Sequence, residues 1–328
     1  EAMPFIPIDT DPPNQTMYRH LLQPYFSPPS VARLEATVRE FVAGRVKRIV
    51  EQGTGDLVKD LAEPVPMLVI FELLEVPEAD RPQLARAAHM MAHPGDDQDV
   101  ALEGGTEVLV YMAEFIQARK TDPGEGLVGR LLTAEFEGRR LTDDEILSFL
   151  FLLPGAGYDT TASGLGDMFL YFARHPDRWA ELVANPDVIP AAAEELLRHQ
   201  SPVVAAARTV MRDCQLAGRD MHAGDKVLLV FAAANLDEDE FADPTECRFD
   251  RQANRHFAFG TGVHRCLGSH LARMEIRVVL EEMARHIESY ELVAGAEPTI
   301  SVGHIRGVAE LPVNVRPRVP TNTEEVAR

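Results

Sequence analysis

The sequence predicts a mainly α-helical fold with small β-sheets. Apolar residues recur at helical spacing through most of residues 13–200 and again after Cys266, whereas short strand-like runs separated by glycine turns occur beyond Pro202. Of the 328 residues, 45% are hydrophobic, which is ample for a sizeable core. We therefore expect one domain over residues 1–328.

Charge and cysteine content restrict the class of protein. A formal net charge of −20 argues against a nucleic-acid partner and against adsorption to anionic membranes. Cys214, Cys247 and Cys266 are an odd number of cysteines in a long chain, which predicts no disulfide framework and a reducing compartment, the cytoplasm. No apolar run of about 18 residues and no signal peptide are visible, so we expect no membrane anchor in this sequence.

The N-terminal helices are expected to form a scaffold. Asp11-Pro12-Pro13 predicts a turn that leads into a helix through Arg19, with Pro13 in its first turn. Four further helices with one apolar face are expected at 30–49, 64–75, 78–92 and 99–120. The polar, glycine-bearing loop 93–97 between the last two is a natural place for a lid.

A long helix is expected from Thr142 to about Arg174, because Thr142 and Glu145 form a capping box. One proline and two glycines at 154–157 lower the helix propensity in the middle of this helix and predict a kink with a functional role. Asp159 and Thr160 follow directly. Such a threonine commonly bonds back to the carbonyl four residues earlier, but inside a broken, buried helix we favour a functional role.

The last part of the chain mixes short helices and strands. Helices are expected at 177–184, 189–200 and 267–286, and strands at 203–210, 215–217, 226–231, 298–302 and 307–315. Residues 235–255 have neither period and predict an irregular segment, and 317–328 predict a tail. Glu195 and Arg198 share a helix face, and such a pair is ordinarily a surface salt bridge worth under about 1 kcal/mol.

A glycine-bearing loop from His256 to Gly268 surrounds Cys266. Leu267 and Leu271 begin an apolar helical face directly after it, so we expect Cys266 at a helix N-terminus. There the unpaired N–H groups and the helix dipole stabilise a thiolate, the form that binds metals or attacks electrophiles. A lone cysteine is ordinarily a buried small hydrophobe, but this combination of features favours chemistry.

The pattern Phe259-x-x-Gly262-x-x-x-Cys266-x-Gly268 resembles the haem-binding loop of the cytochromes P450. The resemblance implies haem b as cofactor, with the Cys266 thiolate as axial ligand of its iron. Thiolate ligation favours O–O cleavage because it supplies electron density. The resemblance also places these residues around the cofactor: Phe259, Gly260, His264 and Gly268.

Two further stretches resemble cofactor-binding parts of soluble bacterial members of this family. Asp11-Pro-Pro-x-Gln15-x-x-x-Arg19 resembles the helix start that sends an arginine to a haem propionate, and Arg208 stands where the family has a second one. A solvated surface arginine is the alternative for Arg19. Glu195-x-x-Arg198 resembles a buried structural pair that a residue from the irregular segment completes. Arg248 and His256 remain open as that third residue.

Residues 156–161 resemble the distal acid–alcohol motif of the family. The resemblance implies that Ala156 and Gly157 border the cofactor, and that Asp159 and Thr160 deliver protons to dioxygen. The implied reaction inserts one atom of dioxygen into a small apolar organic substrate. Four residues are expected to line that substrate: Leu152, Ala156, Val204 and Ile305.

The resemblance implies a cytochrome P450 fold similar to the camphor-hydroxylating bacterial class, N-terminally incomplete because relatives carry further residues before the equivalent of Asp11. Since no flavin or iron–sulfur motif is visible, we expect a separate ferredoxin or flavoprotein as electron donor. One alternative is a truncated haem-binding fragment without turnover. Another is a peroxide-driven hydroxylase, although such relatives typically lack the pair formed here by Asp159 and Thr160.

Overall fold

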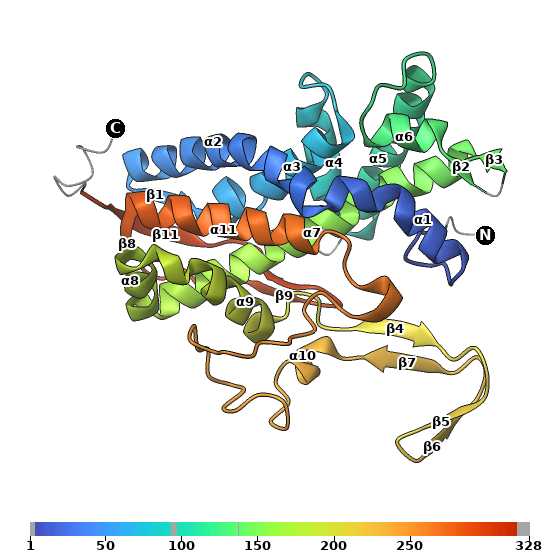
Figure 1. Cartoon of the computed structure of the whole chain (residues 1–328). Helices are drawn as coiled ribbons and strands as arrows, with labels where there is room; N and C mark the ends of the chain where they lie inside the picture. The colour runs from blue at the N-terminus through green and yellow to red at the C-terminus, as the bar shows by residue number, and fades with distance from the viewer. Residues whose placement is uncertain (1–3, 93–96, 137, 320–328) are drawn as a thin grey trace.

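The computed structural model describes residues 4–92, 97–136 and 138–319, and it confirms the mainly helical prediction (Figure 1). The α-helices of the described part are α1 (Asn14–Leu22), α2 (Pro28–Gln52), α3 (Pro64–Leu74), α4 (Arg81–Ala92), α5 (Gln98–Arg119), α6 (Leu127–Thr133), α7 (Asp143–Arg174), α8 (Pro176–Ala184), α9 (Ile189–Gln200), α10 (Phe231–Ala234) and α11 (Ser269–His286). Short helical turns η1 (Gln23–Phe26), η2 (Val58–Ala62), η3 (Pro186–Val188) and η4 (Gly262–His264) connect them.

The strands form small antiparallel sheets. They are β1 (Thr54–Asp56), β2 (Glu135–Phe136), β3 (Arg139–Arg140), β4 (Ala206–Thr209), β5 (Cys214–Leu216), β6 (Arg219–Met221), β7 (Lys226–Leu229), β8 (Ile287–Leu292), β9 (Ile300–Val302), β10 (Arg306–Val308) and β11 (Pro312–Pro317). One sheet has the order β1-β11-β8, and β2–β3, β4–β7, β5–β6 and β9–β10 pair as two-stranded sheets.

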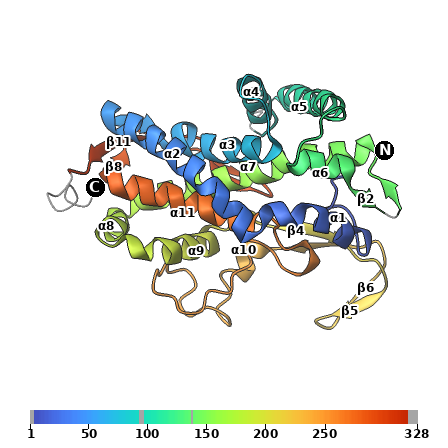
Figure 2. The same cartoon turned by 45° about the horizontal axis from the view of Figure 1, so that its top comes forward.

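Helix α7 lies at the centre of the molecule. It packs against α3 and α5 on one side, against α8, α9 and α11 on another, and against the β9–β10 hairpin. Figures 1 and 2 show α2, α3, α7 and α11 running side by side, with the β4–β7 and β5–β6 pairs outside this group of helices. Most of α7 is buried because 19 of its residues face the core, including Phe149, Leu165 and Phe172.

The capping box that opens α7 is present as predicted. The Thr142 side chain accepts from the Glu145 N–H at 3.2 Å, and the Thr142 N–H donates to Glu145 Oε2 at 2.8 Å. The predicted long helix is confirmed, since α7 continues from Asp143 to Arg174 with Pro154 inside it, and the kink expected at 154–157 stays a prediction. Burial of Leu153 and Pro154 in the core stabilises a conformation that intrinsic propensity disfavours.

Several other boundaries differ from the sequence prediction. The run 307–315 contains two strands, β10 and β11, and the strands β1 and β8 that flank β11 were not predicted. Thr54-Gly55-Asp56 carries no strand signal of its own, and long-range pairing with Asn314-Val313-Pro312 makes it a strand. The predicted lid loop 93–97 falls outside the described residues except for Asp97, whose side chain caps α5.

The extent of the predicted domain stays a prediction, because both ends of the range 1–328 lie outside the described residues. Within them, one continuous cluster of buried side chains joins α1 through α9, α11 and the strands β8 and β11. None of the described helices is long and apolar enough to cross a membrane.

Candidate functional site

The cysteine loop is closed by its own backbone. The Cys266 N–H donates to the Phe259 carbonyl at 2.8 Å, and the Gly260 N–H donates to the Phe257 carbonyl at 2.8 Å. Gly260 has a φ of +61°, in the left-handed region that favours glycine. The loop therefore turns back on itself and presents Cys266 three residues before α11 begins.

The Cys266 thiol is exposed on one side and surrounded by protein on the others. Desolvation raises its pKa above the usual range, while the Gly268 N–H and the guanidinium groups of Arg19, Arg273 and Arg265 lower it. The net direction is upward, so the predicted stabilisation of a free thiolate by the helix start is outweighed. A bond to a metal ion would supply the missing stabilisation, because a coordinating thiol is deprotonated outright.

Cationic groups gather beside this thiol. Burial lowers the pKa of Arg19, and the Cys266 sulfur acts on it in the opposite direction. Burial likewise lowers the pKa of His264, with contributions from the charges of Arg208 and Arg19. Arg19 and Arg208 thus both lie within electrostatic reach of His264. Of the described residues, none forms an ion pair with Arg19 or Arg208, so both guanidinium groups are available to an anion.

Helix α1 is fixed to the cysteine loop by a buried amide. Gln15, which is 1% exposed, donates from Nε2 to the Val263 carbonyl at 2.8 Å. This bond holds Arg19, one turn further along α1, beside Cys266. A surface role for Arg19 does not explain this tether.

These residues fit haem b. An exposed thiol matches an axial ligand of the iron, and two unpaired arginines with His264 match the two propionates. Gly268 leaves the sulfur uncovered: a Cβ added there would lie 3.9 Å from Cys266 Sγ. The donor set on this side of the loop therefore suits the group that the sequence motif implies.

Phe259, at the start of the cysteine loop, is held in place by Arg273 of α11. The Arg273 guanidinium lies over its ring, 4.4 Å from the centroid, and donates to Glu194 at 2.5 and 2.8 Å. His256 Nε2 lies 3.1 Å from the same carboxylate. Burial would raise the pKa of Glu194, but these partners outweigh it and lower the pKa to about 2. Glu194 therefore stays ionised and fixes both Arg273 and His256 around Phe259.

Glu195 and Arg198 are fully buried on α9, and both are 0% exposed. Arg251 Nε completes the pair, 3.1 Å from Glu195 Oε1. Neither open alternative from the sequence supplies this side chain. Arg248 contributes only its backbone N–H, at 2.9 Å from Glu195 Oε1, and His256 pairs with Glu194. Charge alone could not select Arg251, because the irregular segment carries several arginines at similar spacing.

On α7, Leu152, Ala156 and Thr160 stand four residues apart and so share a face. Ala156 is exposed, and Leu152 and Thr160 are half-buried. The Thr160 hydroxyl donates to the Ala156 carbonyl at 2.8 Å, which is the back-bonded arrangement named as the alternative. That bond uses the proton of the hydroxyl and leaves its oxygen lone pairs as acceptors. Asp159, which directly precedes Thr160, accepts a hydrogen bond from Ser163 Oγ at 3.4 Å.

Gly157 lies against α3. A Cβ added there would come 2.8 Å from Ile70 Cδ1, so any larger residue would force the Ile70 side chain to shift. The family resemblance implies that Gly157 borders the cofactor. The structure gives Gly157 a packing role with α3, and its contact with the cofactor stays a prediction.

The other predicted substrate residues converge from two segments. Val203 pairs with Ile305 in an isolated antiparallel bridge, and the Val204 N–H donates to the His304 carbonyl at 2.9 Å. Val204 also accepts from the Ala232 N–H at 3.1 Å. A Cβ at Gly260 would lie 3.8 Å from the Phe231 ring, which connects this region to the cysteine loop.

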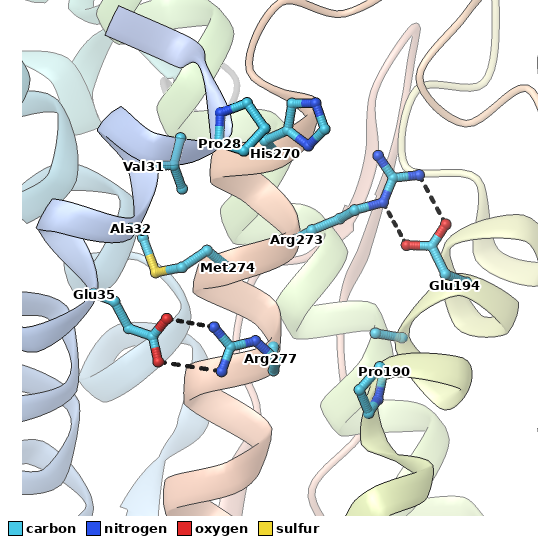
Figure 3. A pocket seen from close by; sticks show the side chains of 11 residues that line it. Pro28, Val31, Ala32, Glu35, Pro190, Glu194, His270, Arg273, Met274 and Arg277 are labelled. Atoms are coloured by element: carbon cyan, nitrogen blue, oxygen red, sulfur yellow. Dashed lines mark hydrogen bonds and ion pairs between the residues drawn. The ribbon is translucent and has the colours of Figure 1, made fainter.

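A separate pocket lies between α2, α9 and α11 (Figure 3). Ion pairs from Glu35 to Arg277 and from Glu194 to Arg273 border it, and Val31, Ala32, Ala193 and Met274 give it an apolar floor. None of the predicted site residues lines this pocket. It adjoins the cysteine loop through Arg273, which covers Phe259.

A helical fold that presents an uncovered cysteine beside one unpaired arginine, with a second near His264 of the same loop, is the arrangement expected of a haem-thiolate protein. The family profile described as Cytochrome P450 matches residues 111–302. The chain is 33% identical to a steroid C26-monooxygenase of Mycolicibacterium smegmatis over 97% of its own length and 81% of that protein. It is 35% identical to a methyl-branched lipid omega-hydroxylase of Mycobacterium bovis over 92% of its own length and 73% of that protein.

Among solved structures, CYP109E1 from Bacillus megaterium in complex with testosterone matches with a TM-score of 0.87 and 29% identity, covering 96% of this chain and 87% of that one. The chain belongs to the cytochrome P450 family. It is a haem-thiolate monooxygenase of bacterial type that uses haem b and dioxygen and takes its electrons from a redox partner.

Proposed function

We propose that this monooxygenase inserts one oxygen atom into an apolar substrate of lipid or steroid type. The residues offered to the substrate, Leu152, Ala156, Val204 and Ile305, are all apolar. They favour shape and hydrophobic area over hydrogen bonds as the basis of selection. The printed activities of two relatives, on a steroid and on a methyl-branched lipid, support this class.

The observation that carries the proposal is the exposed Cys266 thiol beside the unpaired Arg19, with the unpaired Arg208 near His264 of the same loop. Cys266 would hold the haem iron, and the two arginines with His264 would hold the propionates. A thiolate-bound haem supplies the activation of dioxygen. Phe259 and Gly260 shape the loop that keeps the thiol in place, and Gly268 leaves room beside the sulfur.

Asp159 and Thr160 would control protons on the substrate side of the cofactor. With its proton engaged by the Ala156 carbonyl, the Thr160 oxygen can accept a hydrogen bond and orient one water. Asp159, at the adjacent position of α7, can pass a proton to that water. Thr160 would thus orient the water, and Asp159 would supply the proton.

The electron donor would be a separate ferredoxin or flavoprotein that docks beside the cysteine loop. The pocket between α2, α9 and α11 offers an apolar floor with a charged rim, and its Arg273 touches Phe259 (Figure 3). We also propose a cytoplasmic location. Cys214, Cys247 and Cys266 are all free thiols, which suits a reducing compartment.

The test is a reconstituted reaction with isotope-labelled dioxygen, a donor and a panel of steroids and branched fatty acids. We expect one labelled oxygen atom in the product, and only when donor and reduced cofactor are present. Product formed with peroxide alone would favour the peroxide-driven alternative. A protein that binds haem and substrate but forms no product with any donor would favour the fragment without turnover.

A further inference from the structure

A row of three polar side chains runs along buried α7. Asp159, Ser163 and Asp167 stand four residues apart and so lie above one another on one face of the helix. The Ser163 hydroxyl donates to Asp159 Oδ1 at 3.4 Å. Asp159 is the residue to which we assign proton supply, whereas Asp167 has no part in that assignment.

Asp167 is 2% exposed, and no described residue donates a hydrogen bond to either of its carboxyl oxygens. A buried carboxylate without partners is costly, so the neutral acid is favoured. Burial raises the pKa of Asp167 to about 7, against the opposing charge of Arg306 on β10. The side chain can therefore hold or release a proton close to neutral pH.

The β9–β10 hairpin seals this row from the side. A Cβ added at Gly307 would lie 2.4 Å from Ser163 Oγ, so only glycine permits the hairpin to close over the serine. At Gly166, Val58 and the Val308 carbonyl complete the cover, and Arg306 is the charged side chain that acts on Asp167. Two other ionisable side chains lie on this face of α7. Asp159 lies eight residues before Asp167, and Tyr171 lies four residues after it. The hairpin thereby shields Ser163 from solvent on this side.

We propose that Asp167 holds a reserve proton for Asp159 and passes it along α7 through the Ser163 hydroxyl. This inference rests on the proposed role of Asp159. Side chains four residues apart have Cβ atoms about 6 Å apart, and because Ser163 does not hydrogen-bond to Asp167, one water would bridge the two side chains. Asp167 does not touch the reacting atoms itself. It acts through Asp159, so we call it a positioning residue.

The proton balance closes without any change of oxidation state. The O–H bond of the Asp167 acid breaks and a new one forms on the bridging water, one proton of that water moves to Ser163 Oγ, and the proton that Ser163 carried moves to the Asp159 carboxylate. Asp167 remains as a carboxylate and recovers one proton from bulk water. The row is then ready for the next proton that Asp159 gives up.

The first test measures the proton itself and needs no turnover. Infrared difference spectra of haem-loaded wild type minus Asp167→Asn should contain the carbonyl band of a protonated carboxylic acid at about pH 6, lost by about pH 8. The buried acid Glu275 gives a similar band in both proteins, and it cancels in the difference. A difference spectrum without this band would overturn the proposal.

The second test measures product formed per reduced cofactor consumed, as a function of pH. In wild type this ratio should fall as pH rises through about 7, as Asp167 loses its proton. Asp167→Asn should remove that step and lower the ratio about tenfold, less than for loss of a direct acid because water still supplies protons. Ser163→Ala should lower the ratio by the same factor. The double variant Asp167→Asn/Ser163→Ala should show no further decrease, because both substitutions interrupt the same proton path.

Asp144→Asn, an exposed carboxyl in the first turn of the same helix, is the matched control and should keep the wild-type profile. Haem content and substrate affinity should be unchanged in every variant. A pH step that persists in Asp167→Asn would overturn the relay even if the infrared band is present. If Asp159→Asn itself has no effect on the ratio, the proposed role of Asp159 fails, while the infrared result still decides whether Asp167 carries a proton.

Discussion

Glu195 and Arg198 form an ion pair on α9 in which neither side chain has any exposed surface. Arg198 donates from Nε and Nη2 to the two carboxylate oxygens at 2.9 and 2.8 Å, and Arg251 Nε donates to the same carboxylate. Arg198 also donates to three backbone carbonyls, those of Asn235, Pro244 and Glu246. One glutamate thus fixes the irregular segment that leads into the cysteine loop.

We predict that Glu195→Ala loses haem. The substitution leaves the buried guanidinium groups of Arg198 and Arg251 without their counter-charge, which costs about 3–5 kcal/mol. That is a large part of the total stability of a folded protein. The haem-to-protein ratio after purification measures the effect.

Glu181→Ala is the matched control, because Arg178 and Glu181 form an i, i+3 pair that is 35% and 39% exposed. It should change stability by less than about 1 kcal/mol and leave haem content intact. Equal haem loading of the two variants would show that the buried pair has no special role in holding the loop.

Arg19, beside Cys266, and Arg208, near His264, should control haem retention. Arg19→Leu and Arg208→Leu each remove one guanidinium that no described residue neutralises, and we expect transfer of haem to apomyoglobin to become at least about tenfold faster, equivalent to ~1.4 kcal/mol. Arg212→Leu, an exposed arginine a few residues beyond β4, is the control and should match wild type. Unchanged transfer rates in both variants would remove the propionate assignment.

Thr160→Ala should uncouple oxygen consumption from product formation. The variant loses the oxygen that orients water but keeps the apolar face of α7, so haem and substrate should bind normally. Positioned proton transfer is worth roughly 10²–10⁴ in rate, enough for hydrogen peroxide to leave in place of product.

Peroxide released per reduced cofactor consumed is the measurement, and Thr160→Ser, which keeps the hydroxyl, is the control. Wild-type coupling in Thr160→Ala would show that the bond to the Ala156 carbonyl is the whole role of the hydroxyl.

Stability should fall as pH rises, in part because of Glu275. Burial raises its pKa to about 8, and one of its oxygens has no partner among the described residues. The folded state therefore binds this proton more tightly than the unfolded state, whose pKa is near 4.5. The contribution to stability is complete below pH 4.5 and is lost as pH rises to about 8.

Glu275→Gln should remove this slope, which is on the order of a few kcal/mol over the whole interval. Urea unfolding at a series of pH values measures it. Glu291→Gln, an exposed residue on β8, should leave the slope as it is in wild type. A wild-type slope in Glu275→Gln would mean that other groups carry the pH dependence.

Local signals account for what the sequence predicted well. The capping box at Thr142, the apolar period after Leu267 and the glycines before Cys266 act within a few residues, so the helices and the cysteine loop could be predicted. Features that depend on distant partners could not. Strand β1 exists through its pairing with β11, and α7 stays continuous at Pro154 because its surroundings support it.

The site divides in the same way. Spacing predicted that Glu195 and Arg198 share a helix face, and the family resemblance implied that the pair is buried. Its partner Arg251 is selected by the three-dimensional path of the irregular segment. The contact of Gly157 with Ile70 and the upward direction of the Cys266 pKa arise from packing between elements. Asp167 gave no sequence signal, because its importance comes from burial without a partner.

The central claim, that Cys266 is the axial ligand of haem iron, is tested most directly by the carbon monoxide spectrum of the reduced protein. Wild type and Cys214→Ser, which alters an exposed cysteine on β5, should both give the red-shifted Soret band of thiolate ligation. Cys266→Ser should lose that band, because a serine hydroxyl does not ionise near neutral pH. A Cys266→Ser protein that keeps the red-shifted band would contradict the account.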